Sequence, residues 1–258
     1  MQMADELPPD ERRVIVPLDE PALHQCNASL KGRRMLADPE VMVVDLPLHD
    51  HQAEHPHGAV AGLIASGRIR NQEVLIMSPL YKDRYLSLEG APDEVTLEKL
   101  LLTIHLCKEL GASEVTITEA RRRSARQTLD LQISATEPRG SGGLSAAAED
   151  VQKEVVRTNS LHEFAGGAAD IESARTLLAR ARCDQDLRLQ GLIEFRSGAN
   201  PLTQQTLSIS TRSETESTRR LAAKAGLPIA EIQAGVERVV AEKVTYDFTF
   251  EVIFPKRS

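Results

Sequence analysis

The sequence predicts an α/β fold, with a parallel sheet in the N-terminal half and an α+β half with an antiparallel sheet after it. In the first half, an apolar pattern with helical spacing over residues 97–107 is joined to short apolar runs through tight connections. Strand–helix–strand units of this kind are typical of parallel sheets. At the other end, residues 244–254 alternate strictly between apolar and polar, as in a strand with one buried face.

The composition narrows the classes of protein to consider. The chain has 258 residues, of which 41% are hydrophobic and 27% charged, as in ordinary globular proteins. A net charge of −7 argues against general nucleic-acid binding. There is no apolar run of ~18 residues and no signal-like N-terminus, so we expect a cytoplasmic protein without a membrane partner. Its three cysteines form no Cys-x-x-Cys motif.

Residues 1–12 are expected to be a disordered lead, and residues 13–137 to form the first α/β domain. Apolar runs predict strands at 14–16, 41–45 and 71–81.

A helix is the clearest unit of this first domain. Its predicted buried face carries Leu97, Leu100, Leu101, Ile104 and Cys107. Its predicted solvated face carries Glu98, Lys99, Lys108 and Glu109. Asp93 or Thr96 is expected to cap the helix, and Gly111 suits the left-handed position after it. A parallel strand at 115–117 is predicted to follow directly.

Residues 138–143 are the predicted linker, and residues 144–258 the predicted α+β domain. Residues 144–158 favour a helix. Further along, Asp170 is expected to cap a helix over 171–182, and a capping box of Ser213 and Glu216 to open another over 214–225. Strands are predicted at 187–196, 202–211 and 244–254, paired antiparallel.

Imidazoles and carboxylates gather directly after the strand at 41–45. The group consists of His49, Asp50, His51, Glu54, His55 and His57. Such side chains bind divalent metals such as zinc or manganese and move protons near neutral pH. Three of them can act as metal ligands, although the spacing matches no established motif. The alternative is a solvated polar loop.

Basic residues gather after the predicted strand at 115–117. They are Arg121, Arg122, Arg123 and Arg126. If they form a loop at the carboxyl end of a parallel strand, their guanidinium groups suit a phosphate ligand. The alternative is a solvated basic turn that pairs with surface acids.

One stretch resembles a known family. Leu97-x-x-Leu100-Leu101-x-x-Ile104, Lys108, Gly111-Ala112, Val115-Thr116 and Ala125-Arg126-Gln127 are similar to the N-terminal domain of ribose-phosphate diphosphokinases. The resemblance covers about residues 70–127 and implies a phosphoribosyltransferase-type fold, with Arg126 and Gln127 at an ATP site.

The sequence also departs from that family. Ser124 and Thr128 replace the family's tyrosine and aspartate, and its Asp-Leu-His and Thr-Gly-Gly-Thr motifs are missing. The resemblance therefore implies a diverged, non-catalytic protein.

Three functions follow as hypotheses. The first is a regulatory or ligand-binding protein that takes a nucleotide or phosphorylated small molecule at Arg121–Gln127. The second is a metal-dependent hydrolase that uses His49, His51 and His55 with Asp50 or Glu54. The third is a structural or assembly protein, a homo-oligomer whose C-terminal strand pairs across subunits if it lies at a sheet edge.

Overall fold

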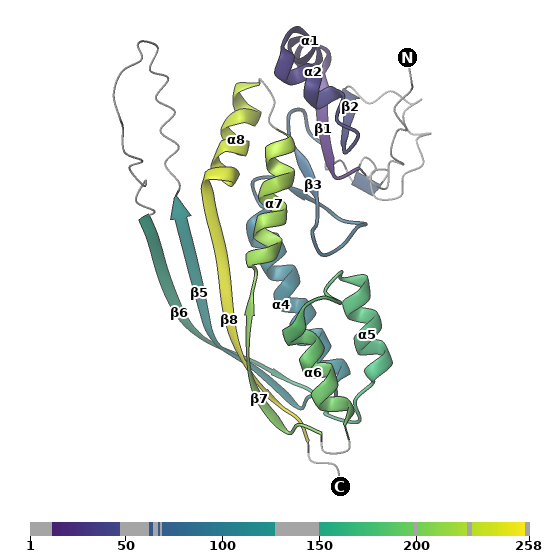
Figure 1. The fold of residues 1–258 in the computed structure, drawn as a ribbon, viewed down its shortest axis with the longest axis vertical. Coiled ribbons are helices and arrows are strands. Elements are labelled where there is room, and N and C mark those ends of the chain that lie inside the picture. The colour runs from purple at the N-terminus through teal and green to yellow at the C-terminus, as the bar shows by residue number, and fades with distance from the viewer. Residues whose placement is uncertain are drawn as a thin grey trace, which may run out of the picture.

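The computed structural model describes residues 12–46, 62–63, 67, 69–126, 150–198, 201–225 and 229–255. These residues form two four-stranded sheets together with helices that lie between and beside them (Figure 1). The fold is therefore mixed α/β, as the sequence predicts.

The first sheet is only partly parallel. Strand β1 (Val14–Asp19) runs parallel to β2 (Val41–Leu46), and the connection between them contains α1 (Glu20–Ala28) and α2 (Leu30–Leu36). Strand β3 (Leu75–Met77) is antiparallel to β1, and β4 (Tyr85–Ser87) is antiparallel to β3. The expectation of a parallel sheet is thus confirmed for one strand pair and wrong for the rest. A seven-residue connection from β3 to β4 is too short for a parallel crossover.

Helix α4 (Ala91–Glu109) buries a face that matches the predicted one only in part. Leu97 and Leu101 are 53% and 44% exposed, whereas Glu98 and Lys99 are only 6% and 1% exposed. Ile104, Cys107 and the long apolar side chains at 95, 102 and 106 are buried. The prediction that Glu98 and Lys99 lie on a solvated face is therefore wrong.

The ends of α4 were predicted with mixed success. Its N-cap is Gly90, which has no side chain that could accept a capping hydrogen bond. Asp93 and Thr96, the predicted caps, lie inside the helix instead. Gly111 has the expected positive φ, +78°. A Cβ there would also come within 2.3 Å of the Gly167 carbonyl oxygen, so packing as well as backbone conformation favours glycine.

The second sheet is fully antiparallel. It contains β6 (Asp150–Glu163), β5 (Glu114–Arg126), β8 (Glu242–Ile253) and β7 (Gln204–Ser210), in that spatial order. The predicted parallel strand at 115–117 is the start of the long strand β5, whose backbone pairs with both neighbours. The helix expected at 144–158 is wrong from residue 150 onward, because β6 begins there.

The two sheets do not divide at the predicted linker. Strand β5 precedes residues 138–143, and its partners β6 and β8 follow them. The linker itself lies outside the described residues.

In the described ranges, four helices follow β6: α5 (Ile171–Arg180), α6 (Leu187–Ser197), α7 (Arg212–Lys224) and α8 (Ala230–Ala241). Asp170 caps α5 as predicted, by accepting the Ser173 N–H at 2.9 Å.

Two predictions for the other helices are wrong. Residues 187–196 are helical because Leu189, Leu192, Ile193 and Arg196 are buried at helical spacing. The predicted capping box does not form at α7: the side chain of its N-cap, Thr211, makes no capping bond to the helix, and the Ser213 hydroxyl donates to Glu214.

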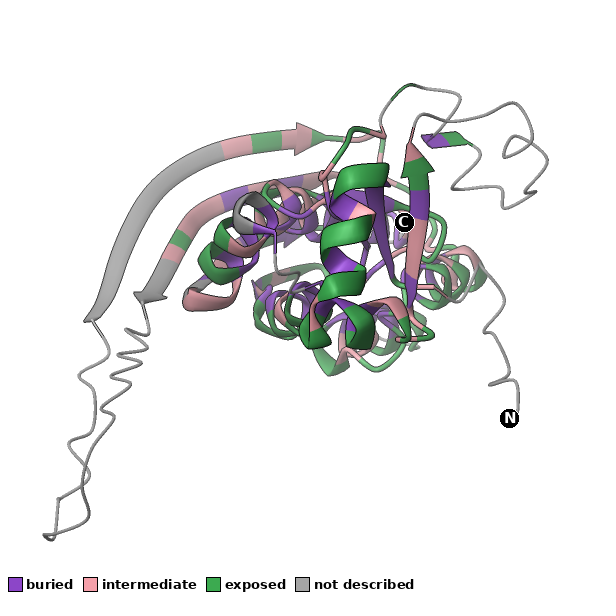
Figure 2. Ribbon diagram, turned by 90° about the horizontal axis from the view of Figure 1, so that it is seen from above, coloured by how far each residue is buried: buried purple, intermediate pink, exposed green. Residues whose placement is uncertain are grey.

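Strand β8 is the centre of the second core, as the alternation predicts. Its inward side chains are buried among apolar residues of α4, α5, α6 and β7: Phe248, Phe250, Val252 and, directly after it, Phe254. Val244, near the start of the strand, is buried as well. The helices lie on the concave side of this curved sheet (Figure 2). Because β8 lies between β5 and β7, it is not the sheet edge that the assembly hypothesis requires.

None of the helices in the described ranges has the length and apolarity needed to cross a lipid bilayer.

Phe250 gives a direct test of this core. Phe250→Ala removes a fully buried ring and should lower the free energy of unfolding by about 3–5 kcal/mol, measured by urea denaturation. Ile253→Ala, on the same strand at a side chain 37% exposed, is the control and should cost much less. A Phe250→Ala variant that melts within about two degrees of the wild type would contradict this account.

Candidate functional site

A buried lysine lies at the centre of a charged cluster. Lys99 Nζ donates to Asp186 Oδ2 at 2.8 Å and to Glu214 Oε1 at 2.9 Å. Its third polar neighbour is Cys183 Sγ at 3.6 Å. The side chains of Lys99, Asp186 and Glu214 are 1%, 24% and 8% exposed. Removing an ammonium from water costs several kcal/mol, so this cluster exists only because two carboxylates compensate the charge.

Backbone geometry holds each partner of Lys99 in place. Asp186 is the N-cap of α6, where its other oxygen accepts the backbone N–H groups of Arg188 and Leu189. Glu214 lies in the first turn of α7, and its second oxygen accepts the Ser213 hydroxyl at 2.9 Å. The three charged side chains therefore come from α4, from the start of α6 and from α7.

The electrostatics fix the protonation states in the cluster. Burial alone would lower the pKa of Lys99, but the charge of Glu214 and the hydrogen bonds that Lys99 donates to both carboxylates raise the pKa above its ordinary value. Burial likewise opposes ionisation of Asp186, yet the bond and charge of Lys99 hold its pKa below the ordinary range. Burial raises the pKa of the Cys183 thiol to about 11. At neutral pH Lys99 is therefore an ammonium, Asp186 a carboxylate and Cys183 a thiol.

A cavity of about 340 Å³ opens beside the cluster. Its wall includes Lys99, Asp186 and Glu214, and further polar groups come from Arg182, Gln185, Ser213 and Ser217. We call this space the Lys99 pocket. Pro79 and Leu80 form an apolar part of the wall. A few polar groups converging on a cavity, with shifted pKa values among them, are typical of a binding site.

A second polar network lies next to the pocket. The Ser78 hydroxyl donates to Glu98 Oε2 at 2.5 Å, and Arg84 forms an ion pair with Glu98 Oε1 at 2.9 Å. Burial raises the pKa of Glu98, and the Ser78 bond and the Arg84 charge offset part of that effect. Adjacent residues of α4 thus carry opposite buried charges, each with its own partners.

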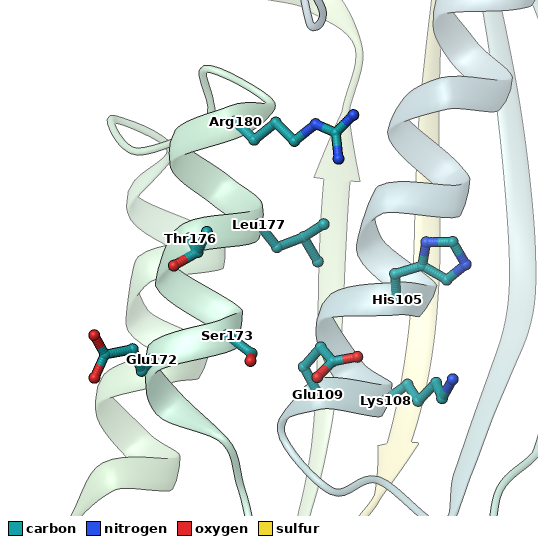
Figure 3. A pocket seen from close by; sticks show the side chains of 8 residues that line it. All are labelled: His105, Lys108, Glu109, Glu172, Ser173, Thr176, Leu177 and Arg180. Carbon is teal, nitrogen blue, oxygen red and sulfur yellow. The ribbon is translucent and has the colours of Figure 1, made fainter.

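A shallower groove of about 440 Å³ lies between α4 and α5 (Figure 3). Arg180 and Leu177 point from α5 toward α4, whereas Glu172 points away (Figure 3). Its polar lining residues are exposed or half-buried, and it contains no buried charge. The Lys99 pocket is therefore the stronger candidate site.

The prediction that the arginines after residue 120 form a loop is wrong. Arg121, Arg122, Arg123 and Arg126 all belong to β5, an antiparallel strand, and Gln127 lies outside the described residues. Arg121 forms an ion pair with Glu119 at 2.9 Å and lies opposite Asp247 of β8. A loop at the carboxyl end of a parallel strand is therefore not what these residues form.

The predicted metal ligands His49, Asp50, His51, Glu54 and His55 lie outside the described residues, as does His57. Within the ranges that the structure describes, no group of three or more His, Cys, Asp or Glu side chains is placed to hold a metal ion.

The chain matches no protein-family model, curated protein or solved structure. The resemblance to ribose-phosphate diphosphokinases over residues 70–127 stays a prediction.

Sequence reasoning missed every residue of the Lys99 cluster. The available signal was weak: Lys99 and Glu98 interrupt an apolar run, and Asp186 precedes a helix-spaced apolar pattern. These features fit a solvated helix face and a helix cap equally well.

Removing the ammonium should destabilise the fold strongly. Lys99→Met leaves Asp186 and Glu214 without their shared cation and should cost about 3–5 kcal/mol in urea denaturation. Lys108→Met, on the exposed side of the same helix, is the matched control and should change stability by less than about 0.5 kcal/mol. Equal stability of the two variants would contradict a structural role for the cluster.

Glu98 should make stability depend on pH. Its pKa is raised above the ordinary 4.5, so the folded state holds this proton more tightly than the unfolded state does. Its contribution to stability is complete below that value and declines as the pH rises through the folded pKa. Glu98→Gln does not titrate. The free energy of unfolding of the wild type, minus that of the variant, should therefore fall as the pH rises above 4.5. A difference that stays constant or rises would refute this.

Proposed function

We propose that this protein binds a small polar molecule in the Lys99 pocket. The observation that supports the proposal is the buried cluster of Lys99, Asp186 and Glu214 beside an open cavity of about 340 Å³. Apolar residues of similar volume usually stabilise a core at least as well as buried ions do. A charged cluster on a cavity wall is more readily explained by recognition of a ligand.

The protonation states favour binding over catalysis. A nucleophilic cysteine needs a lowered pKa, and that of Cys183 is raised to about 11. A nucleophilic or basic lysine must lose its proton, and the two carboxylates hold the proton on Lys99.

The other hypotheses receive less support. Nucleotide or phosphate binding at Arg121–Gln127 stays a prediction, and the ion pair between Arg121 and Glu119 would compete with such a ligand. The metal-dependent hydrolase stays a prediction that depends on His49, His51 and His55. Assembly as a homo-oligomer also stays a prediction, without the sheet-edge position of β8 to motivate it.

A screen with two blocked variants tests the proposal. Inorganic phosphate, ATP, glucose and L-leucine are each added while the melting temperature is measured. A pocket ligand at about 100 times its Kd should stabilise the wild type by about 2.7 kcal/mol. Ser217→Phe, which fills the Lys99 pocket, should abolish the shift, and Ser173→Phe, in the α4–α5 groove, should retain it.

Two outcomes would reject the proposal. One is that no probe changes the melting temperature. The other is that a probe binds and only Ser173→Phe abolishes the effect, which would move the site to the groove between α4 and α5.

A further inference from the structure

The two carboxylates of the Lys99 pocket, Asp186 and Glu214, have hydrogen-bond acceptor sites that no group of the protein uses in the described structure. Lys99 contributes one positive charge and the two carboxylates contribute two negative ones, so the cluster keeps one net negative charge. An ionised carboxylate offers about four lone-pair sites. Asp186 uses three, for Lys99 and two backbone N–H groups of α6, and Glu214 uses two, for Lys99 and Ser213. About three acceptor sites are left, the number that a ligand ammonium group can fill.

Lys99 itself cannot bind an anionic group. An ammonium has three donors, and those of Lys99 are directed at Asp186, Glu214 and Cys183. A negative group on the ligand therefore needs a different cation.

Arg182 is that cation. It lines the same pocket, and within the described part of the chain it has no ion pair. Partial burial, and after it the positive charge of Arg13, lower the pKa of Arg182. A guanidinium group on a pocket wall suits a carboxylate or a similar anion, which it can bind through two parallel N–H bonds.

The backbone of Arg182 is an independent sign of function. Its φ is +52°, a left-handed conformation that an arginine adopts only with strain. Its N–H bonds the Ala179 carbonyl at the end of α5, and the next N–H bonds that of Leu178. Helices prefer glycine at this position. Strain of this kind is typically retained where a side chain is needed for function.

We infer that the Lys99 pocket takes a small zwitterion with an ammonium and a carboxylate group, as in a free amino acid. The ammonium lies against Asp186 and Glu214, and the carboxylate lies against Arg182. The inference rests on the proposed function of the pocket. Pro79 and Leu80 leave part of the wall apolar, which allows an aliphatic side chain on the ligand.

Titration calorimetry at neutral pH tests the charge requirement. The probes are glycine, L-glutamine and L-leucine, with the N-acetyl and methyl ester derivatives of whichever binds best. The parent should bind, and each derivative should bind at least about tenfold more weakly, because it lacks one of the two charges. A derivative that binds as tightly as its parent would overturn the inference, as would failure of all three amino acids.

Arg182→Gly separates function from stability. Glycine relieves the backbone strain, so the variant should melt no lower than the wild type while its affinity for the amino acid falls at least about tenfold. Gln72→Gly is the matched control, since Gln72 has a φ of +64° and does not line the pocket. It should keep the wild-type affinity. Unchanged affinity in Arg182→Gly would remove Arg182 from the site and overturn the inference.

The two proposals can fail separately. If phosphate, ATP or glucose binds, Ser217→Phe abolishes binding and no amino acid binds, the pocket is a ligand site and only the zwitterion inference is wrong. If no probe of either experiment binds, both are wrong.

Discussion

The ammonium group of Lys99 is the constraint on which the arrangement of the helices depends. Helix α4 contributes Val95 to the core of the first sheet, and Leu102 and Leu106 to the core of the second. Helix α7 also serves both regions, because Leu221 packs in the first core while Glu214 lies beside Lys99. The bonds of Lys99 therefore join two helices that each connect the cores, and they fix the start of α6 through Asp186 as well. A hydrophobic contact at this point would tolerate a rotation of α4. The Lys99 ammonium does not, because it must keep its hydrogen bonds to three partners.

The neighbouring charge strengthens this constraint. Glu98 pairs with Arg84 and Ser78 on the side of the first sheet, and Lys99 pairs with Asp186 and Glu214 on the other. A slip of α4 by one residue in one direction would place the Glu98 carboxylate against the carboxylates of Asp186 and Glu214. A slip in the other direction would place the Lys99 ammonium against the Arg84 guanidinium. Like charges in a poorly solvated space repel strongly, so the pair selects one register of the helix. These residues thus specify a unique packing, whatever their net contribution to stability.

The sequence predicts what depends on local periodicity. The alternation of β8, the apolar runs of β1 and β2 and the cap of α5 at Asp170 are all local, and all are confirmed. Residues 187–196 were misread because a short apolar run fits a strand or a helix until its partners are known. The buried face of α4 was misread for a related reason. Leu97 looks buried and Lys99 looks exposed until Asp186 and Glu214, which are 87 and 115 positions away, are placed beside the lysine.

The same argument explains why the search for sites by local density of chemical groups did not find the Lys99 pocket. Charges that are neighbours in sequence can neutralise one another, as Arg121 and Glu119 do on β5, where residues two apart lie on the same face. Their density then reflects a solvated sheet surface as easily as a site. The members of the Lys99 cluster come instead one each from separate segments, and each is unremarkable in its own segment. A lysine becomes informative only when the fold removes it from water, because burial forces it to have partners that a surface lysine does not need.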